Sequence, residues 1–116
     1  PPLVHPRHIG TIPRLLGTYV REQGLLTWEE AIRKLTSLPA DIIGLDDRGT
    51  LAEGFLADIV IFDPETIRDM ATFEDPFHYP IGMQYVFVNG TAVVDEGEYT
   101  RALPGRALRG PAYVNQ

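Results

Sequence analysis

The chain has 116 residues, of which 44% are hydrophobic and 22% are charged, and its formal net charge is −6. This composition is typical of a folded globular domain and excludes wholesale disorder. The acidic excess would repel a phosphate backbone, so a nucleic-acid partner is not expected. Because the sequence has no cysteine and no apolar run long enough to span a membrane, we expect a cytoplasmic protein without disulfides or thiolate metal sites.

The first thirteen residues predict a loop, because four prolines fall among them without any hydrophobic period. A helix is predicted from Arg14 to the stop signal at Gly24. Its apolar positions recur at helical spacing at Leu15, Leu16, Tyr19 and Val20. Pro13 suits the first turn of this helix, and Thr11 is the predicted N-cap.

The second predicted helix has the clearest start signal in the chain. Thr27 and Glu30 have the spacing of a capping box. The apolar stripe that follows consists of Trp28, Ala31, Ile32, Leu35 and Leu38. Pro39 is expected to end this helix or to bend it into a short helical turn, which Gly44 closes.

The second half of the chain has the pattern of strands. The run ADIVIFD, residues 57–63, predicts a short buried strand. The run MQYVFVNGTAVVDEGEY, residues 83–99, predicts a hairpin around Asn89-Gly90, the strongest short-range hairpin signal. Residues 64–80 between them are expected to form a long loop.

These elements predict an α+β fold with two or three helices and three strands. Three strands make a narrow sheet with unpaired edges, and unpaired edges usually have a partner. The pattern therefore indicates a structure that is completed by further protein.

Histidine and arginine are concentrated between His5 and Gly24. His5 and His8 could belong to a metal site, but a catalytic zinc ion needs three protein ligands and the only other histidine is His78. No ligand pair with the spacing H-E-x-x-H occurs. A polar loop is therefore favoured over a metal site.

Arg7 and Arg14 are candidates for binding an anion. A guanidinium can hold a carboxylate through two parallel charge-assisted hydrogen bonds. Arg7 lies in the proline-containing segment, and loops often present binding residues. The residues alone leave two interpretations open, which are an anion site and arginines that are solvated or paired within the protein.

Three motifs carry a resemblance to a known family. They are His5-Pro6-Arg7 with Gly10-Thr11 and Pro13-Arg14, the helix sequence EEAIRKLTSLPA and the hairpin sequence HYPIGMQYVFVNG. With them, nearly the whole chain resembles the C-terminal part of the D-aminoacylases, the N-acyl-D-amino-acid deacylases of the amidohydrolase superfamily. The segment EGFLADIVIF is shared more widely, with dihydroorotase-like amidohydrolases.

The resemblance implies a zinc-dependent hydrolase that cleaves the acyl group from an N-acyl-D-amino acid. It implies a (β/α)8 barrel joined to a small β-sandwich domain. Residues 1–49 would be the loop and last helices of the barrel, and residues 50–116 would be the C-terminal strands of the sandwich and an extended tail. In this family the zinc ligands and the catalytic aspartate precede the part that this chain resembles, so no catalytic or metal-binding residue is expected here.

The resemblance also implies that Arg7 lies beside the carboxylate of the substrate, with His5 as a second substrate-binding or loop-shaping candidate. Zinc would be the cofactor of the full-length enzyme, and the 116-residue chain alone is expected to be inactive. Its partner would be the rest of the barrel or a second copy of the chain. The alternative function is a free-standing, non-catalytic binding or assembly module derived from an amidohydrolase.

Overall fold

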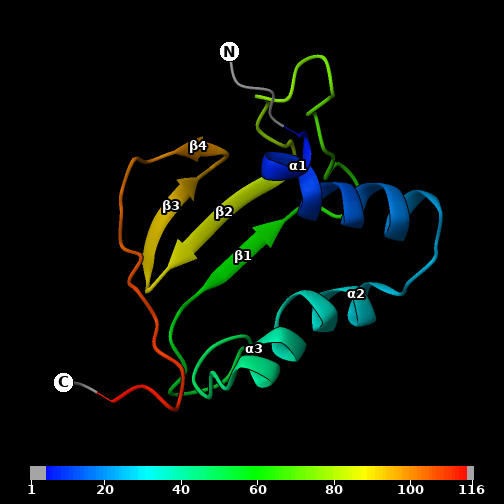
Figure 1. The fold of residues 1–116 in the computed structure, drawn as a ribbon. Coiled ribbons are helices and arrows are strands. Elements are labelled where there is room, and N and C mark those ends of the chain that lie inside the picture. The colour runs from blue at the N-terminus through cyan, green and yellow to red at the C-terminus, as the bar shows by residue number, and fades with distance from the viewer. Residues whose placement is uncertain (1–4, 115–116) are drawn as a thin grey trace.

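The computed structural model describes residues 5–114, which form an α+β fold (Figure 1). The α+β class is therefore confirmed. The elements in chain order are α1 (Arg7–Arg14), η1 (Leu15–Glu22), α2 (Trp28–Leu35), α3 (Ser37–Ile43), β1 (Ile59–Phe62), β2 (Met83–Val88), β3 (Thr91–Asp95) and β4 (Glu98–Tyr99). The helices lie beside the sheet, with β1 as the strand nearest to them (Figure 1).

The predicted N-terminal loop is wrong from Arg7 onward, because this residue already begins α1. Residues 1–4 lie outside the described part. Pro6 is the N-cap of α1, where no backbone donor is needed, and Pro13 lies inside the helix. Thr11 is not an N-cap, since its hydroxyl donates to the carbonyl of Arg7 at 2.7 Å. The helix continues directly into η1, a π-helical segment, so the loss of one backbone donor at Pro13 does not break it.

The start of α2 at Thr27 is confirmed. The Thr27 hydroxyl oxygen accepts a hydrogen bond from the backbone N–H of Glu30 at 3.2 Å. The Glu30 carboxylate does not accept the second hydrogen bond of a capping box, from the backbone N–H of Thr27. It accepts two hydrogen bonds of 2.9 and 2.8 Å from the Arg33 guanidinium instead. The N-cap half of the predicted capping box is therefore present.

The end of the predicted second helix differs from the expectation. The helix is interrupted at Thr36, whose φ of −129° and ψ of −82° are not helical. A separate helix, α3, then carries Pro39 in its first turn. It ends at Gly44, which has a φ of +80° and a left-handed C-cap conformation, as predicted.

The sheet is antiparallel throughout, in the order β1-β2-β3-β4. The predicted turn at Asn89 and Gly90 is confirmed, with φ of +49° and +80° as a type I′ turn requires. The expected number of three strands is wrong, because Glu96 and Gly97 also take positive φ and turn the chain into β4.

The strand predicted within residues 57–63 is present as β1, but its predicted burial is wrong. Val60 and Ile61 are 48% and 45% exposed. On the side away from β2, this strand has no strand partner among residues 5–114.

The core lies between the helices and the adjoining ends of β1 and β2. It is built from the buried residues Leu16, Val20, Ala31 and Ile67, with Leu26, Trp28, Ile32, Leu35, Phe62 and Met83 packed against them. Large apolar side chains elsewhere are exposed, such as Ile42 at 74% and Leu51 at 80%. No helix of the described part is long and apolar enough to cross a membrane.

Candidate functional site

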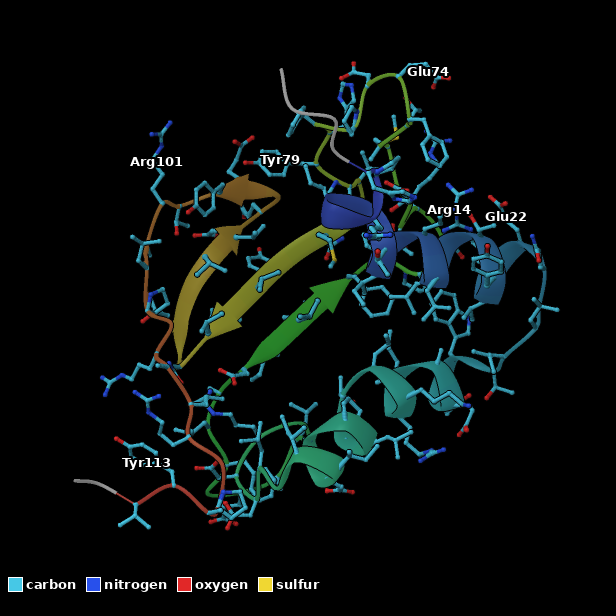
Figure 2. All side chains as sticks on the ribbon, in the orientation of Figure 1. Arg14, Glu22, Glu74, Tyr79, Arg101 and Tyr113 are labelled. Carbon is cyan, nitrogen blue, oxygen red and sulfur yellow. The ribbon has the colours of Figure 1, made fainter. Side chains whose placement is uncertain are left out.

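A pocket of about 560 Å³ lies between the N-terminal helix and the loop that follows β1. One wall is built by residues from His5 to Tyr19, and the other by Asp69 and residues 71–74. Figure 2 shows Glu74 at the outer end of this loop and Arg14 on the helix. The pocket therefore joins two segments that are fifty residues apart in the sequence.

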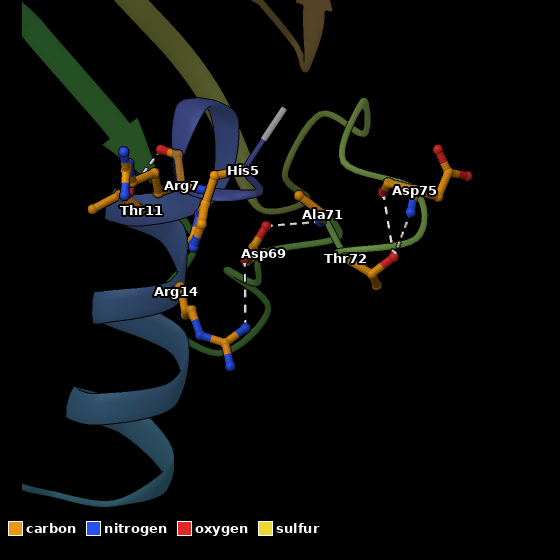
Figure 3. Close-up of polar contacts among 8 residues, drawn as sticks. All are labelled: His5, Arg7, Thr11, Arg14, Asp69, Ala71, Thr72 and Asp75. Carbon is orange, nitrogen blue, oxygen red and sulfur yellow. Dashed lines mark hydrogen bonds and ion pairs between the residues drawn. The ribbon is translucent and has the colours of Figure 1, made fainter. Parts of the chain in front are cut away.

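Asp69 connects the two walls of this pocket (Figure 3). Its side chain is only 6% exposed. One carboxylate oxygen, Oδ1, accepts a hydrogen bond from the backbone N–H of Ala71 at 2.8 Å. The other, Oδ2, lies 3.7 Å from Nη1 of Arg14. Of the two interpretations of Arg14, the structure therefore favours an arginine that is paired within the protein.

Arg7 begins α1 and lines the pocket with an exposed side chain. Within residues 5–114, no carboxylate lies at ion-pair distance from its guanidinium. The two arginines of the site thus differ. Arg14 is paired with Asp69, whereas Arg7 can offer its five N–H donors to a bound anion.

His5 contacts both walls. Its Nδ1 atom accepts a hydrogen bond of 3.0 Å from the backbone N–H of Arg7, which satisfies one unpaired donor of the first helical turn. Its ring packs edge-on against Phe73, with ring centroids 4.9 Å apart and an interplanar angle of 77°. His5 therefore shapes the pocket with one ring nitrogen already occupied.

The histidines do not assemble a metal site in the described part of the chain. His78 lies in the exposed loop, where its Nε2 atom contacts Oδ2 of Asp75 at 2.6 Å. The His8 side chain lies outside the described residues. No group of three or more histidine, aspartate or glutamate side chains within the described part could hold a metal ion. These residues therefore do not fit a zinc site.

Sequence reasoning missed Asp69, because no local motif marks it. A signal does exist on the helix that it contacts. Gly10 and Gly17 are seven residues apart, and each is followed four residues later by an arginine, Arg14 and Arg21. This spacing places the four residues on neighbouring parts of one helix face, beside the loop that carries Asp69.

A second pocket, the β1 groove, has a volume of about 540 Å³. It lies between α2 and β1 and is lined within residues 29–37, 49–51 and 58–62. At its margin, Asp58 pairs with Arg48 and accepts a hydrogen bond from the backbone N–H of Asn89 at 2.8 Å. Partial burial works to raise the pKa of Asp58, but the Asn89 hydrogen bond and the Arg48 ion pair hold it below its ordinary value.

Comparisons with known proteins agree on one family. The sequence model of the amidohydrolase family matches residues 4–94. The chain is 47% identical over 110 residues to an N-acyl-D-glutamate deacylase of Alcaligenes xylosoxydans xylosoxydans, in an alignment covering 95% of this chain and 22% of that protein. The chain thus spans about a fifth of the length of this relative.

Two solved structures are also similar. A D-aminoacylase, described as defining a novel subset of amidohydrolases, aligns with a TM-score of 0.81 and 46% identity over 84% of this chain and 21% of its own. An N-acyl-D-glutamate deacylase of Bordetella bronchiseptica, solved with zinc and a phosphonate inhibitor, aligns with a TM-score of 0.76 and 42% identity over 84% of this chain and 22% of its own. The predicted resemblance to D-aminoacylases is confirmed.

Proposed function

The chain belongs to the amidohydrolase family, and we propose that it is the C-terminal part of a zinc-dependent N-acyl-D-amino-acid deacylase. Such an enzyme hydrolyses the amide bond of N-acyl-D-amino acids. The similarity to deacylases over nearly the whole chain supports this proposal. Because the chain spans about a fifth of these relatives, we assign the activity to a longer protein and substrate binding to this part of it.

The observation that carries the proposal is the difference in ion pairing between the two arginines in the pocket. An N-acyl-D-amino acid carries a carboxylate, and a guanidinium can bind it through two hydrogen bonds. Arg14 is paired with Asp69, whereas Arg7 has no ion-pair partner within residues 5–114. We therefore assign the substrate carboxylate to Arg7. His5 holds the first turn of α1 and supports the loop wall through Phe73.

The division of the chain also supports this proposal. Within residues 5–114, the helices precede residue 49 and the strands follow residue 50. We assign residues 1–49 to the last loop and helices of a (β/α)8 barrel, and residues 50–116 to strands and tail of a small β-sandwich domain. Active sites of such barrels lie at the ends of the strands, where the following loops meet. The start of α1, with Arg7, would follow one of these strands.

Zinc belongs in this proposal to the rest of the enzyme. The described residues do not fit a zinc site, so this chain supplies no ligand from that part and its own residues act by binding and orienting the substrate. Bound zinc would supply the activation of the attacking water. The partner of the chain would be the remainder of the barrel, and the exposed edge of β1 beside the β1 groove offers a surface for that contact.

The complete protein that contains this chain tests the proposal directly. It should release the carboxylic acid from N-acetyl-D-amino acids, with the corresponding L-enantiomers as the control. A metal chelator should abolish this hydrolysis, and zinc should restore it. The 116-residue chain alone should bind no stoichiometric zinc. A complete protein that cleaves no N-acyl-D-amino acid under these conditions would contradict the proposed function.

A further inference from the structure

The helix formed by α1 and η1 has a face on which two glycines allow close contact with the loop. A Cβ atom at Gly10 would lie 1.9 Å from Oδ1 of Asp69, and all three of its nearest neighbours would be atoms of that carboxylate. A Cβ atom at Gly17 would lie 2.6 Å from the carbonyl oxygen of Ile67. Neither distance is possible between unbonded atoms, so a side chain at Gly17 would have to move the loop backbone and one at Gly10 would have to move the Asp69 carboxylate.

An arginine fastens the loop beside each glycine. Arg14 pairs with the Asp69 carboxylate at 3.7 Å. Nη1 of Arg21 donates hydrogen bonds to the carbonyl oxygens of Ile67 at 2.6 Å and Pro64 at 3.2 Å. We call Gly10, Arg14, Gly17 and Arg21 the glycine–arginine track.

Asp69 is the link between this track and the pocket. Its carboxylate is almost fully buried, and buried charges require partners. It has one on each side, Arg14 on the helix and the backbone N–H of Ala71 in the loop (Figure 3). Ala71 is itself only 5% exposed and begins the stretch of residues 71–74 that forms the second wall. The position of this wall therefore depends on the Asp69 carboxylate.

From these contacts we propose that Asp69 is a positioning residue for substrate binding. It holds residues 71–74 at a fixed distance from the helix that carries Arg7, and it keeps Arg14 paired so that Arg7 is the cation that meets the substrate carboxylate. Asp69 does not itself touch the substrate. The inference rests on the proposed function, because it concerns the pocket for an N-acyl-D-amino acid.

The Asp69→Ala variant of the complete enzyme should show a rise in KM of roughly tenfold or more, with kcat changed little. This split is expected because Asp69 touches neither the substrate nor the amide bond that breaks, and acts only on the position of groups that bind the substrate. Asp69→Asn keeps an acceptor for the Ala71 N–H and loses only the charge, so its KM should rise less. Asp75→Ala is the matched control, because that carboxylate lies in the same loop but is exposed and contacts His78, and its KM should stay unchanged.

The Gly10→Ala variant tests the contact itself. In the native background its methyl group must displace the Asp69 carboxylate, so KM should rise as it does in Asp69→Ala. In the Asp69→Ala background that carboxylate is absent, so Gly10→Ala should raise KM no further. The double variant should also be at least as stable as Asp69→Ala alone, since alanine favours helix more than glycine does. Equal harm from Gly10→Ala in both backgrounds would overturn the proposal.

Hydrogen exchange gives an answer that does not depend on activity. The backbone amides of residues 71–74 should exchange faster in Asp69→Ala than in the native and Asp75→Ala proteins. The size-matched Asp69→Asn should show the same change to a smaller extent. Unchanged exchange and unchanged KM in Asp69→Ala would overturn the proposal. If the native protein hydrolyses no N-acyl-D-amino acid and Asp69→Ala still shows this faster exchange, the proposed function is contradicted and the fixing of the loop by Asp69 is supported.

Discussion

Two pockets in the described part of the chain have nearly equal volumes, about 560 and 540 Å³, yet their walls are held in different ways. The walls of the first are joined by buried polar contacts at Asp69 and carry the exposed Arg7. The β1 groove instead exposes apolar side chains such as Val60 and Leu51 at an unpaired strand edge. Volume therefore does not distinguish them. A fixed cationic rim suits a small anionic ligand, whereas an apolar strand edge suits another segment of protein.

The largest expected effect is that of Arg7→Ala on the catalysis of the complete enzyme. Loss of a desolvated charge partner typically costs about 2–5 kcal/mol. The ratio kcat/KM should therefore fall roughly thirtyfold to several thousandfold, while the zinc content stays unchanged. Steady-state kinetics with an N-acetyl-D-amino acid and metal analysis measure both quantities.

Two further variants make this result specific. Arg106→Ala removes an exposed arginine of the tail and should leave kcat/KM near the native value. Arg7→Lys should restore little activity, because an ammonium group cannot reproduce the planar two-pronged contact. If Arg7→Ala kept a nearly native kcat/KM, the first pocket would lose its assignment as the carboxylate site.

Val60→Asp in the β1 groove should lower the stability of the complete enzyme and leave substrate binding unchanged, in contrast to Arg7→Ala. If the rest of the enzyme packs on β1, this substitution buries an unpaired charge and should lower the stability of the complete protein by about 2–3 kcal/mol, without a change in KM. In the 116-residue chain Val60 is 48% exposed, so the same variant should have little effect there. Thermal unfolding of both proteins gives this comparison.

Leu103→Asp serves as the control for Val60→Asp, since Leu103 lies in the tail and is 88% exposed. Both proteins should tolerate it. Equal stability of the native and Val60→Asp complete enzymes would show that no partner covers the groove.

A smaller effect is expected from pH at the margin of the groove. The pKa of Asp58 is lowered below its ordinary value of 3.8, so its ionised form stabilises the folded state. This contribution is fully present above the ordinary value and is lost as the pH falls through the lowered one. An unfolded aspartate titrates at pH ~4. Urea unfolding between about pH 5 and pH 2 should therefore show that the free energy of unfolding depends less on pH in Asp58→Asn than in the native chain. Identical curves would contradict the stabilising role of Asp58.

The smallest predicted effect concerns the helix that borders the groove. Thr27→Ala removes the N-cap of α2 and should destabilise the chain by about 1 kcal/mol in urea unfolding. Thr27→Ser keeps the capping oxygen and should be nearly neutral. Neither variant should change the KM of the complete enzyme, because Thr27 does not line the pocket of Arg7.

The sequence predictions were correct where the interactions are local in the sequence. Asn89-Gly90, Thr27 and Gly44 act within a few residues, and their turn, N-cap and C-cap were predicted because the required dihedral angles and hydrogen bonds are local. Arg7 lines the pocket, and its role in binding the substrate carboxylate, which rests on the family resemblance of its motif, stays a prediction.

The failures have two physical causes. Pro6 was interpreted as a loop residue and Pro13 as the start of a helix, although an N-cap needs no backbone donor and one lost donor does not end a helix that continues as η1. Asp69 was missed because its meaning depends on a helix more than fifty residues away, and a single sequence without alignment does not show such a contact. Glu96 was missed as a turn residue because its left-handed conformation is unusual for a non-glycine residue.

The hydrogen bonds of Arg21 have a consequence for sequence divergence in this loop. Its guanidinium binds the carbonyl oxygens of Pro64 and Ile67, which every amino acid possesses. The side chains of Pro64 and Glu65 are exposed, so substitutions at these two positions leave the attachment intact. Substitutions at Arg21 or Gly17 remove it. Related chains can therefore vary the outer surface of this loop freely while they retain its course across the helix.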